Sequence, residues 1–242
     1  MKFKNKTVFI SGVNRGLGKS IFEKFLKEGA NIICTVRKKN KTFSKYLENL
    51  KLVYKNKIRI LYLDFENKEK LIAGLNKIKK NIIIDVLINN AGYASGSILE
   101  MTKIEEIEKN FQINFYAPII IIQKLLPNLK KSKNPSIINI GSISSFLNHK
   151  GTIAYGSSKA SIAFATKVMA NEFQRYKIRV NAIAPSAINT DMLKKMDKNS
   201  RLRLLKDTNI QKPLSVKKIV RKVLLLSSSK LNNINGKIIK NF

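Results

Sequence analysis

Tyr155 and Lys159 are the residues whose types and spacing could most directly do chemistry in this chain. They stand four positions apart, at the start of an apolar, small-residue run that predicts a long buried helix. Side chains at that spacing share one helix face. A phenol that exchanges protons near neutral pH needs its ordinary pKa of about 10 lowered, and a neighbouring ammonium has that effect. The pair alone also fits a core ring beside a solvated charge, so the rest of the chain must decide.

Other proton chemistry is restricted by composition, because the chain holds one cysteine, Cys34, and one histidine, His149. No disulfide, zinc cluster or Ser-His-Asp triad can be assembled within one chain, and we predict no metal site. Cys34 lies in an apolar run where a buried thiol is expected, and His149 is predicted to be a surface loop residue. The remaining candidates are tyrosine, lysine, serine and carboxylates, which favours Tyr155.

Length and charge narrow the class of protein. The 242 residues, 44% of them hydrophobic, suit a single α/β domain over 1–242. No apolar run reaches 18 residues and no cleavage site follows the basic start, so we expect a soluble, cytoplasmic chain and no membrane partner. The net charge is +32. The basic residues are spread over nearly every polar segment rather than gathered with aromatics, so we expect no specific nucleic-acid partner.

A glycine-rich turn lies between a predicted strand over 7–10 and a predicted helix over 19–28. Gly12, Gly16 and Gly18 permit a tight turn and a close backbone approach, and the helix N-terminus attracts phosphate. An ordinary strand-to-helix turn is the alternative. The spacing and context favour a dinucleotide site.

Strand and helix patterns alternate along the whole chain, which predicts a Rossmann-type, doubly wound parallel sheet of about seven strands with helices on both faces. Further strands are predicted over 31–36, 58–63, 82–88, 136–140, 178–184 and 237–240. Further helices are predicted over 43–52, 71–78, 105–129 with a kink at Pro118, from Tyr155 onward, and over 216–226. Residues 186–213 include a strongly charged, irregular stretch and are predicted to form a substrate lid.

The tip of the second strand bears on cofactor choice. An acid there would bind a ribose 2′-hydroxyl, whereas basic residues accommodate a 2′-phosphate. The chain has Arg37, Lys38 and Lys39 there with no acid, and Arg15 in the glycine turn. This favours NADP(H), with NAD(H) as the second choice, although solvated charges in a basic protein would look the same.

Together these motifs resemble the short-chain dehydrogenase/reductase family over essentially the whole chain. The glycine turn matches at Gly12, Gly16 and Gly18, with Ser11 where threonine is usual, and residues 89–92 match its Asn-Asn-Ala-Gly segment. Its Tyr-x-x-x-Lys motif falls on the Tyr155 pair. The resemblance implies the catalytic residues Asn114, Ser142, Tyr155 and Lys159, and the cofactor-binding residues Gly12, Asn14, Arg15, Gly16, Leu17, Gly18, Arg37, Asp64, Phe65, Asn90, Ala91, Gly92, Tyr155, Lys159, Pro185, Ile188 and Thr190.

The resemblance also implies roles. Tyr155 would protonate a substrate oxygen that Ser142 holds, while Lys159 would bond the nicotinamide ribose and lower the pKa of Tyr155. Asn114 would support a proton-relaying water, and Asp64 would contact the adenine ring. Ser186 replaces the usual glycine after Pro185, so a glycine-only backbone conformation there is in question. The end of the chain also lacks the family's Asp-Gly-Gly.

Within the family the chain looks most like the 3-oxoacyl-[acyl-carrier-protein] reductases. The expected substrate is a small carbonyl compound or alcohol, which could be bound to a carrier protein. A sugar, polyketide, or small ketone or aldehyde substrate stays open, as does a cofactor-binding regulatory protein without turnover. The apolar outer faces of the helices that carry Asn114 and Tyr155 predict a homo-tetramer or homo-dimer.

Overall fold

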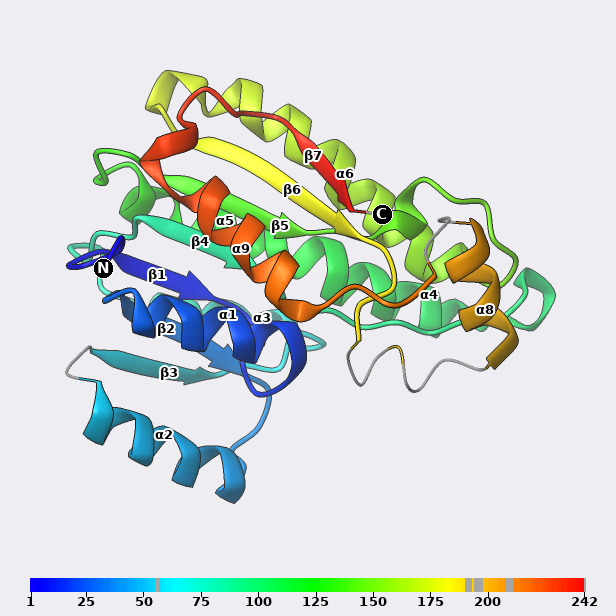
Figure 1. Ribbon diagram of the computed structural model, residues 1–242, viewed down its shortest axis with the longest axis horizontal. Helices are drawn as coiled ribbons and strands as arrows, with labels where there is room; N and C mark the ends of the chain where they lie inside the picture. Colours follow the sequence, from blue (N-terminus) through cyan, green and yellow to red (C-terminus); the bar gives the residue numbers. More distant parts are fainter. Residues whose placement is uncertain (55–56, 190–192, 194–197, 208–210, 242) are drawn as a thin grey trace.

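The computed structural model describes residues 1–54, 57–189, 193, 198–207 and 211–241. Seven parallel strands form one sheet in the order β3-β2-β1-β4-β5-β6-β7 (Figure 1). The strands are β1 (Thr7–Ile10), β2 (Asn31–Val36), β3 (Ile58–Tyr62), β4 (Val86–Asn89), β5 (Ser136–Ile140), β6 (Arg179–Pro185) and β7 (Ile238–Asn241). The predicted doubly wound parallel sheet is confirmed.

Helices cover both faces of this sheet (Figure 1). One layer holds α1 (Gly16–Lys27), α2 (Lys41–Val53) and α9 (Val216–Ser227), and the other holds α3 (Lys68–Asn76), α4 (Ile104–Phe111), α5 (Ala117–Leu129) and α6 (Ile153–Glu172). Within β1, Val8 and Ile10 face the first layer while Phe9 faces the second. Both sides of each central strand are therefore buried, which explains why the strands are apolar almost throughout.

The carboxyl ends of all seven strands meet at one edge of the sheet, where α8 (Lys198–Asp207) also lies (Figure 1). β1 pairs with β2 on one side and with β4 on the other. Strand order reverses at this point, and in open α/β sheets the crevice beside such a reversal binds ligands.

Two predicted elements differ from the structure. The apolar run 82–88 becomes strand only from Val86, because the backbone of Ile82 and Ile84 bonds to the end of α5. The Asn128 side chain donates to the carbonyl of Ile82 (2.7 Å), and the Ile84 amide donates to the carbonyl of Asn128 (3.2 Å). The predicted irregular lid contains a helix, α8. Residues 190–192, 194–197 and 208–210 of that lid lie outside the described residues.

In the described part of the chain, no helix combines the length and apolar character needed to cross a membrane.

Candidate active site

The glycine turn after β1 packs too closely for side chains. Gly12 has a φ of +72°, and a Cβ on it would lie 2.9 Å from the Cα of Ala91. A Cβ on Gly18 would lie 2.1 Å from the carbonyl oxygen of Gly12. These two glycines are therefore required by backbone conformation and by close approach.

Ser11 joins the glycine turn to the segment after β4. Its Oγ accepts hydrogen bonds from the backbone amides of Asn90 and Ala91, both at 3.0 Å. The Asn90 side chain in turn donates to the carbonyls of Ser11 (3.0 Å) and Gly12 (2.9 Å). The sequence showed Ser11 only as a departure from threonine. A serine keeps the same hydroxyl, and that shared group is the signal that could have identified its role.

The start of α1 fits a bound phosphate. The helix begins at Gly16, its N-cap residue Arg15 makes no side-chain capping bond, and its first turn contains no acid. Unsatisfied amides and the positive end of the helix dipole favour an anion at such a terminus. Asn14 and Arg15 are exposed beside it, whereas Leu17 is buried. The turn therefore fits the pyrophosphate of a dinucleotide.

The tip of β2 carries the predicted cations, and an acid lies close to them. Arg37, Lys38 and Lys39 are exposed. The Arg37 guanidinium lies 3.4 Å from the Glu66 carboxylate, which also pairs with Lys109 at 3.2 Å. Sequence reasoning did not identify Glu66, because its proximity to Arg37 depends on the pairing of β2 with β3.

The segment after β3 contains Asp64 and Phe65, two of the predicted cofactor-binding residues, and they differ in exposure. Asp64 is half-buried, and its carboxylate accepts from the Glu66 amide at 3.2 Å. Phe65 is buried, and its carbonyl accepts from the Gln112 side chain at 2.9 Å. Asp64 is therefore the more accessible of the two.

Tyr155 and Lys159 lie on one face of α6, beside the carboxyl end of β5. Ser142 follows the carboxyl end of β5, and its side chain lies close enough to Tyr155 to act on the pKa of that phenol. Lys159 is buried, with its Nζ 2.9 Å from the carbonyl of Ile140 and 6.0 Å from the centre of the Tyr155 ring. The structure thus brings together Tyr155 and Lys159, whose spacing indicated a shared face, and Ser142, which the resemblance implied.

Burial dominates the proton affinities of this pair. It raises the pKa of Tyr155, and the nearby Ser142 side chain only partly opposes that shift. Burial also lowers the pKa of Lys159 to about 8. Burial of the phenolate, and not the Lys159 ammonium, sets the direction of this shift, so the lowering of the pKa of Tyr155 by Lys159 stays a prediction for the cofactor-bound site.

Asn114 lies in a π-helical turn, Gln112–Tyr116, between α4 and α5. Its side chain accepts from the Tyr93 amide (2.9 Å) and donates to the Tyr93 carbonyl (2.8 Å) and to Ser158 Oγ (3.0 Å). A Cβ on Gly92 would lie 3.3 Å from Asn114 Oδ1 and 3.5 Å from Lys159 Nζ. Asn114 therefore belongs to the same group of side chains, and π turns are frequent at functional sites.

Pro118, where the sequence predicted a kink, directly follows the π-helical turn. The helix changes its hydrogen-bonding pattern before Pro118, which lies in the first turn of α5, where proline is well tolerated. Sequence reasoning also missed Asn110 and Ser158, which bond to Asn114. The spacing of Asn110, one turn before Asn114, was the available signal.

The segment after β6 contains Ser186, whose backbone conformation the sequence left in question. Ser186 is absent from the residues with positive φ, so this position uses no glycine-only conformation. Pro185 ends β6, and Ile188 forms an isolated parallel bridge with Leu214. Thr190 lies outside the described residues.

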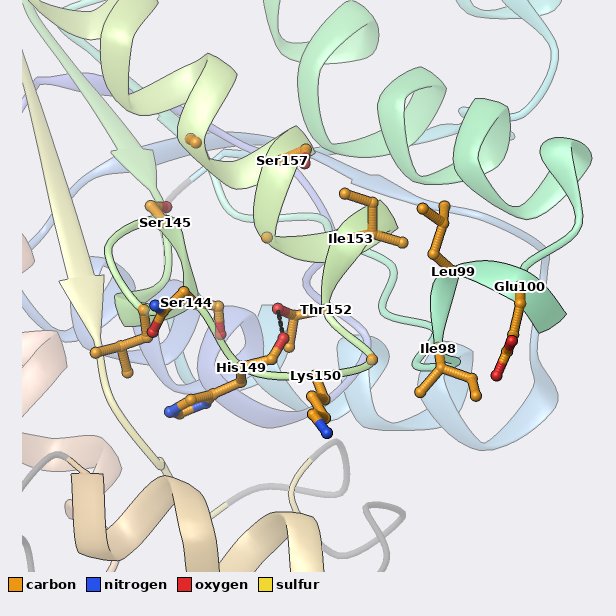
Figure 2. A pocket seen from close by; sticks show the side chains of 15 residues that line it. Ile98, Leu99, Glu100, Ser144, Ser145, His149, Lys150, Thr152, Ile153 and Ser157 are labelled. Atoms are coloured by element: carbon orange, nitrogen blue, oxygen red, sulfur yellow. Dashed lines mark hydrogen bonds between the residues drawn. The ribbon is translucent and has the colours of Figure 1, made fainter.

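A cavity of about 880 Å³ adjoins this site (Figure 2). It lies between residues 98–100, the loop 144–152 and α6, which lines it with Ile153, Gly156, Ser157 and Ala160. At about 100° per residue, these positions lie on a different face of α6 from Tyr155 and Lys159. The cavity is therefore a neighbour of the Tyr155 site and not its centre.

His149, on the cavity wall, corrects a further prediction. Its side chain is only 14% exposed and pairs with Asp207 at the end of α8. It is a partly buried link between the loop 144–152 and α8, whereas the sequence placed it on the surface.

Comparison with known proteins agrees with this architecture. Residues 6–201 match the family model of the short chain dehydrogenases, so the chain belongs to the short-chain dehydrogenase/reductase family and is an oxidoreductase. The family binds NAD(P). The resemblance seen in the sequence is thereby confirmed.

Individual relatives differ in the substrates that their names state. The chain is 29% identical to the 3-oxoacyl-[acyl-carrier-protein] reductase FabG of Buchnera aphidicola subsp. Schizaphis graminum, over 99% of this chain and 96% of that protein. It is 27% identical to a 3alpha-hydroxysteroid dehydrogenase of Mediterraneibacter gnavus, over 99% and 96%. A short-chain dehydrogenase/reductase of Serratia marcescens shares the fold, with a TM-score of 0.89 at 20% identity over 100% and 98% of the two chains.

Proposed function

We propose that this protein is an NADP(H)-dependent reductase of a carbonyl compound, with a 3-oxoacyl thioester on a carrier protein as the favoured substrate. The observation that carries the proposal is the meeting of Ser142, Tyr155, Lys159 and Asn114 at the carboxyl edge of the sheet, next to a glycine turn that fits a dinucleotide.

The side chains divide the proposed reaction between them. When bound, the nicotinamide supplies a hydride to the carbonyl carbon. Tyr155 gives its proton to the oxygen that becomes the alcohol, and general acid catalysis of this kind contributes roughly 10²- to 10⁴-fold. Ser142, whose side chain lies near Tyr155, holds the same oxygen. Burial raises the pKa of Tyr155, so the phenol is protonated at neutral pH but is a weaker acid until its phenolate is stabilised.

Lys159 and Asn114 support that proton transfer. We propose that Lys159 bonds the nicotinamide ribose and steadies the phenolate that Tyr155 becomes. The proposed water relay reaches Lys159 beside Gly92, where the Asn114 side chain also lies. Because that side chain is committed to Tyr93 and Ser158, its contribution is to keep this corner of the site in place.

The preference for NADP(H) rests on Arg15, Arg37, Lys38 and Lys39, which are exposed around the tip of β2. Glu66 pairs with Arg37 and places an acid near the same position, which supports NAD(H) as the second cofactor. The remaining cations outnumber this acid, and a 2′-phosphate has more partners here than a 2′-hydroxyl.

The substrate class is testable directly. FabG relatives support the 3-oxoacyl thioester, while the hydroxysteroid dehydrogenase supports the alternative of another ketone or alcohol. NADPH oxidation should be followed with an acetoacetyl thioester and with steroid, sugar and simple ketone substrates. We expect the acetoacetyl thioester to be turned over fastest. Faster turnover of a steroid, a sugar or a simple ketone would assign that class as the substrate instead.

The phenol of Tyr155 carries the first prediction. Tyr155→Phe should keep NADPH affinity, because the ring remains, and should lose roughly 10²- to 10⁴-fold in kcat for reduction, because the proton donor is gone. Fluorescence titration and stopped-assay turnover measure the two quantities. Wild-type turnover by this variant would refute the assignment. A wild-type chain that binds NADPH but reduces nothing on the panel would favour the regulatory alternative.

We further propose a single domain over 1–242 with a substrate lid over 186–213, a cytoplasmic location, and a homo-tetramer or homo-dimer. The assembly is supported by large apolar side chains left exposed on the layer of α4, α5 and α6, among them Ile104 (61% exposed) and Phe164 (71% exposed). Helix faces of this kind are typical of surfaces that another subunit covers.

A further inference from the structure

Buried polar atoms without a partner gather at the carboxyl edge of the sheet. Four such side-chain atoms occur among the described residues, and three of them, in Asn89, Ser145 and Ser186, lie at or just beyond the ends of β4, β5 and β6. Asn89 and Ser186 are both buried next to predicted cofactor-binding positions, at 3% and 8% exposure, and Ser186 is the one of the two that carries a hydroxyl. A buried hydroxyl without a partner is unfavourable, so the molecule must offset this cost elsewhere or satisfy the group with a ligand.

Strand geometry places Ser186 on the side of the sheet that carries Tyr155. Along β6, Val180 packs with the α6 residues Ile162 and Met169, whereas Ile183 packs with α9 on the opposite side. Successive residues of a strand alternate between faces, so Ser186, an even number of positions after Val180, continues on the α6 side.

Register places Ser186 at the level of the reaction site as well. Ile183 is paired with Ile140 of β5, and the amide of Gly141 donates to the Ile183 carbonyl at 2.8 Å. Ser142 is the second residue after the end of β5, and Ser186 is the first residue after the end of β6. The two serines therefore leave neighbouring strands at the same edge.

The backbone around Ser186 is held in place. Just after it, the Leu214 amide donates to the Ala187 carbonyl at 2.7 Å, and the Asn189 amide donates to the Leu214 carbonyl at 3.2 Å. The hydroxyl is thus presented from a fixed segment, between Pro185 and Ile188.

We propose that the Ser186 hydroxyl hydrogen-bonds the carboxamide of the bound nicotinamide and is a positioning residue for that ring. This rests on the proposed NADP(H) function. A carboxamide offers both an acceptor oxygen and a donor nitrogen, and a hydroxyl can pair with either. The bond would satisfy an oxygen that the described residues leave unpartnered, and glycine or alanine at this position could not form it.

The test compares two ligands that differ in the nicotinamide. Ser186→Ala and Ser186→Gly should raise the Kd for NADPH about five- to tenfold, equivalent to ~1 kcal/mol. The Kd for 2′-phospho-ADP-ribose, which lacks the nicotinamide, should stay at its wild-type value. Calorimetric titration of the intact protein gives both constants. If the wild type prefers NADH, the ligand pair becomes NADH and ADP-ribose.

Ser145→Ala is the matched control, because it also removes a buried, unpartnered hydroxyl near the edge of the sheet. It should leave both dissociation constants unchanged. Thermal unfolding adds a readout without ligand: the Ser186→Ala protein should be at least as stable as the wild type, since an unsatisfied group has been removed.

Several results would overturn the inference. An equal change for both ligands would mean that Ser186 only shapes the fold, and no change for either would mean that its hydroxyl does not meet the cofactor. If the Ser186 variants raise the KM for the carbonyl substrate and leave the NADPH Kd unchanged, the hydroxyl contacts the substrate and not the nicotinamide. A wild-type chain that binds none of these nucleotides would refute the proposed function, and this inference with it.

Discussion

At the scale of single residues, desolvation decides the proton chemistry of the site. Both ionisable groups on the reacting face of α6 are pushed toward their neutral forms, the pKa of Tyr155 upward and that of Lys159 downward to about 8. Such a site holds Tyr155 in its protonated form, but the raised pKa makes the phenol a weaker proton donor. In the proposed reaction, any stabilisation of the phenolate has to come from the bound cofactor together with Lys159, since the protein's own groups leave the pKa of Tyr155 raised.

The lowered pKa of Lys159 predicts how stability depends on pH. Between pH 8 and 10.5 the unfolded chain binds more protons at this lysine than the folded protein does, so this group makes the free energy of unfolding rise with pH in that window. Lys159→Met should lose this contribution and give a flatter profile. Urea unfolding from pH 7 to pH 10 measures it. Lys167→Met, which removes an exposed charge from the same helix, should keep the wild-type slope. Identical slopes for wild type and Lys159→Met would contradict the prediction.

At the scale of elements, the site depends on loops that are joined across the edge of the sheet. The turn between β1 and α1 is bonded to the segment after β4 through Ser11 and Asn90. The segment at Tyr93 is bonded to the π-helical turn through Asn114. Each contact links an element on the cofactor side to one nearer the reacting groups. A substitution that displaces one of these loops should therefore displace the loop bonded to it.

Ser11 offers a test of that link. Ser11→Ala leaves the amides of Asn90 and Ala91 without their acceptor, and should lower the free energy of unfolding by about 1–3 kcal/mol. The distorted glycine turn should also bind NADPH roughly tenfold more weakly, by about 1.4 kcal/mol. Ser11→Thr keeps the hydroxyl and should behave like the wild type in both unfolding and titration experiments. Equal losses in the two variants would show that the hydroxyl is not the important group.

At the scale of the whole molecule, two surface properties matter for association: a net charge of +32 and an apolar face formed by exposed large apolar side chains on α4 and α6. The charge repels other copies of the chain at low salt, whereas burial of the apolar face favours their association. The proposed assembly requires that burial of apolar area outweigh the repulsion, which screening by salt assists.

Phe164 should be central to that association, because it is 71% exposed on α6. Phe164→Glu would bury a charge in a subunit contact and should shift the protein toward smaller species in light scattering at micromolar concentration. Leu52→Glu, at an 86% exposed position on α2 in the other helix layer, should leave the mass unchanged. A monomeric wild type would contradict the assembly. An unchanged mass for Phe164→Glu would place the contact elsewhere.

The sequence by itself determined the order of strands and helices, the parallel sheet, and the motifs of the family. These follow from spacing over a few residues: alternation in strands, a shared face four positions apart in a helix, and glycines between a strand and a helix. For that reason, local spacing was enough to predict the Tyr155 and Lys159 pair and the glycine turn with Gly12, Gly16 and Gly18. The boundaries of the elements were harder to predict from the sequence. The start of β4, for example, depends on a hydrogen bond from the Asn128 side chain to the Ile82 carbonyl.

The tertiary structure decided whatever depends on residues far apart in the chain. Ser11 and Asn90 are 79 positions apart, and the hydrogen bonds between them do not follow from any local pattern. The pairing of Glu66 with Arg37 and that of Asp207 with His149 also arise only once strands and helices are packed. The same holds for the pKa of Lys159 and the unpartnered hydroxyl of Ser186, because burial is set by everything that surrounds a group in space.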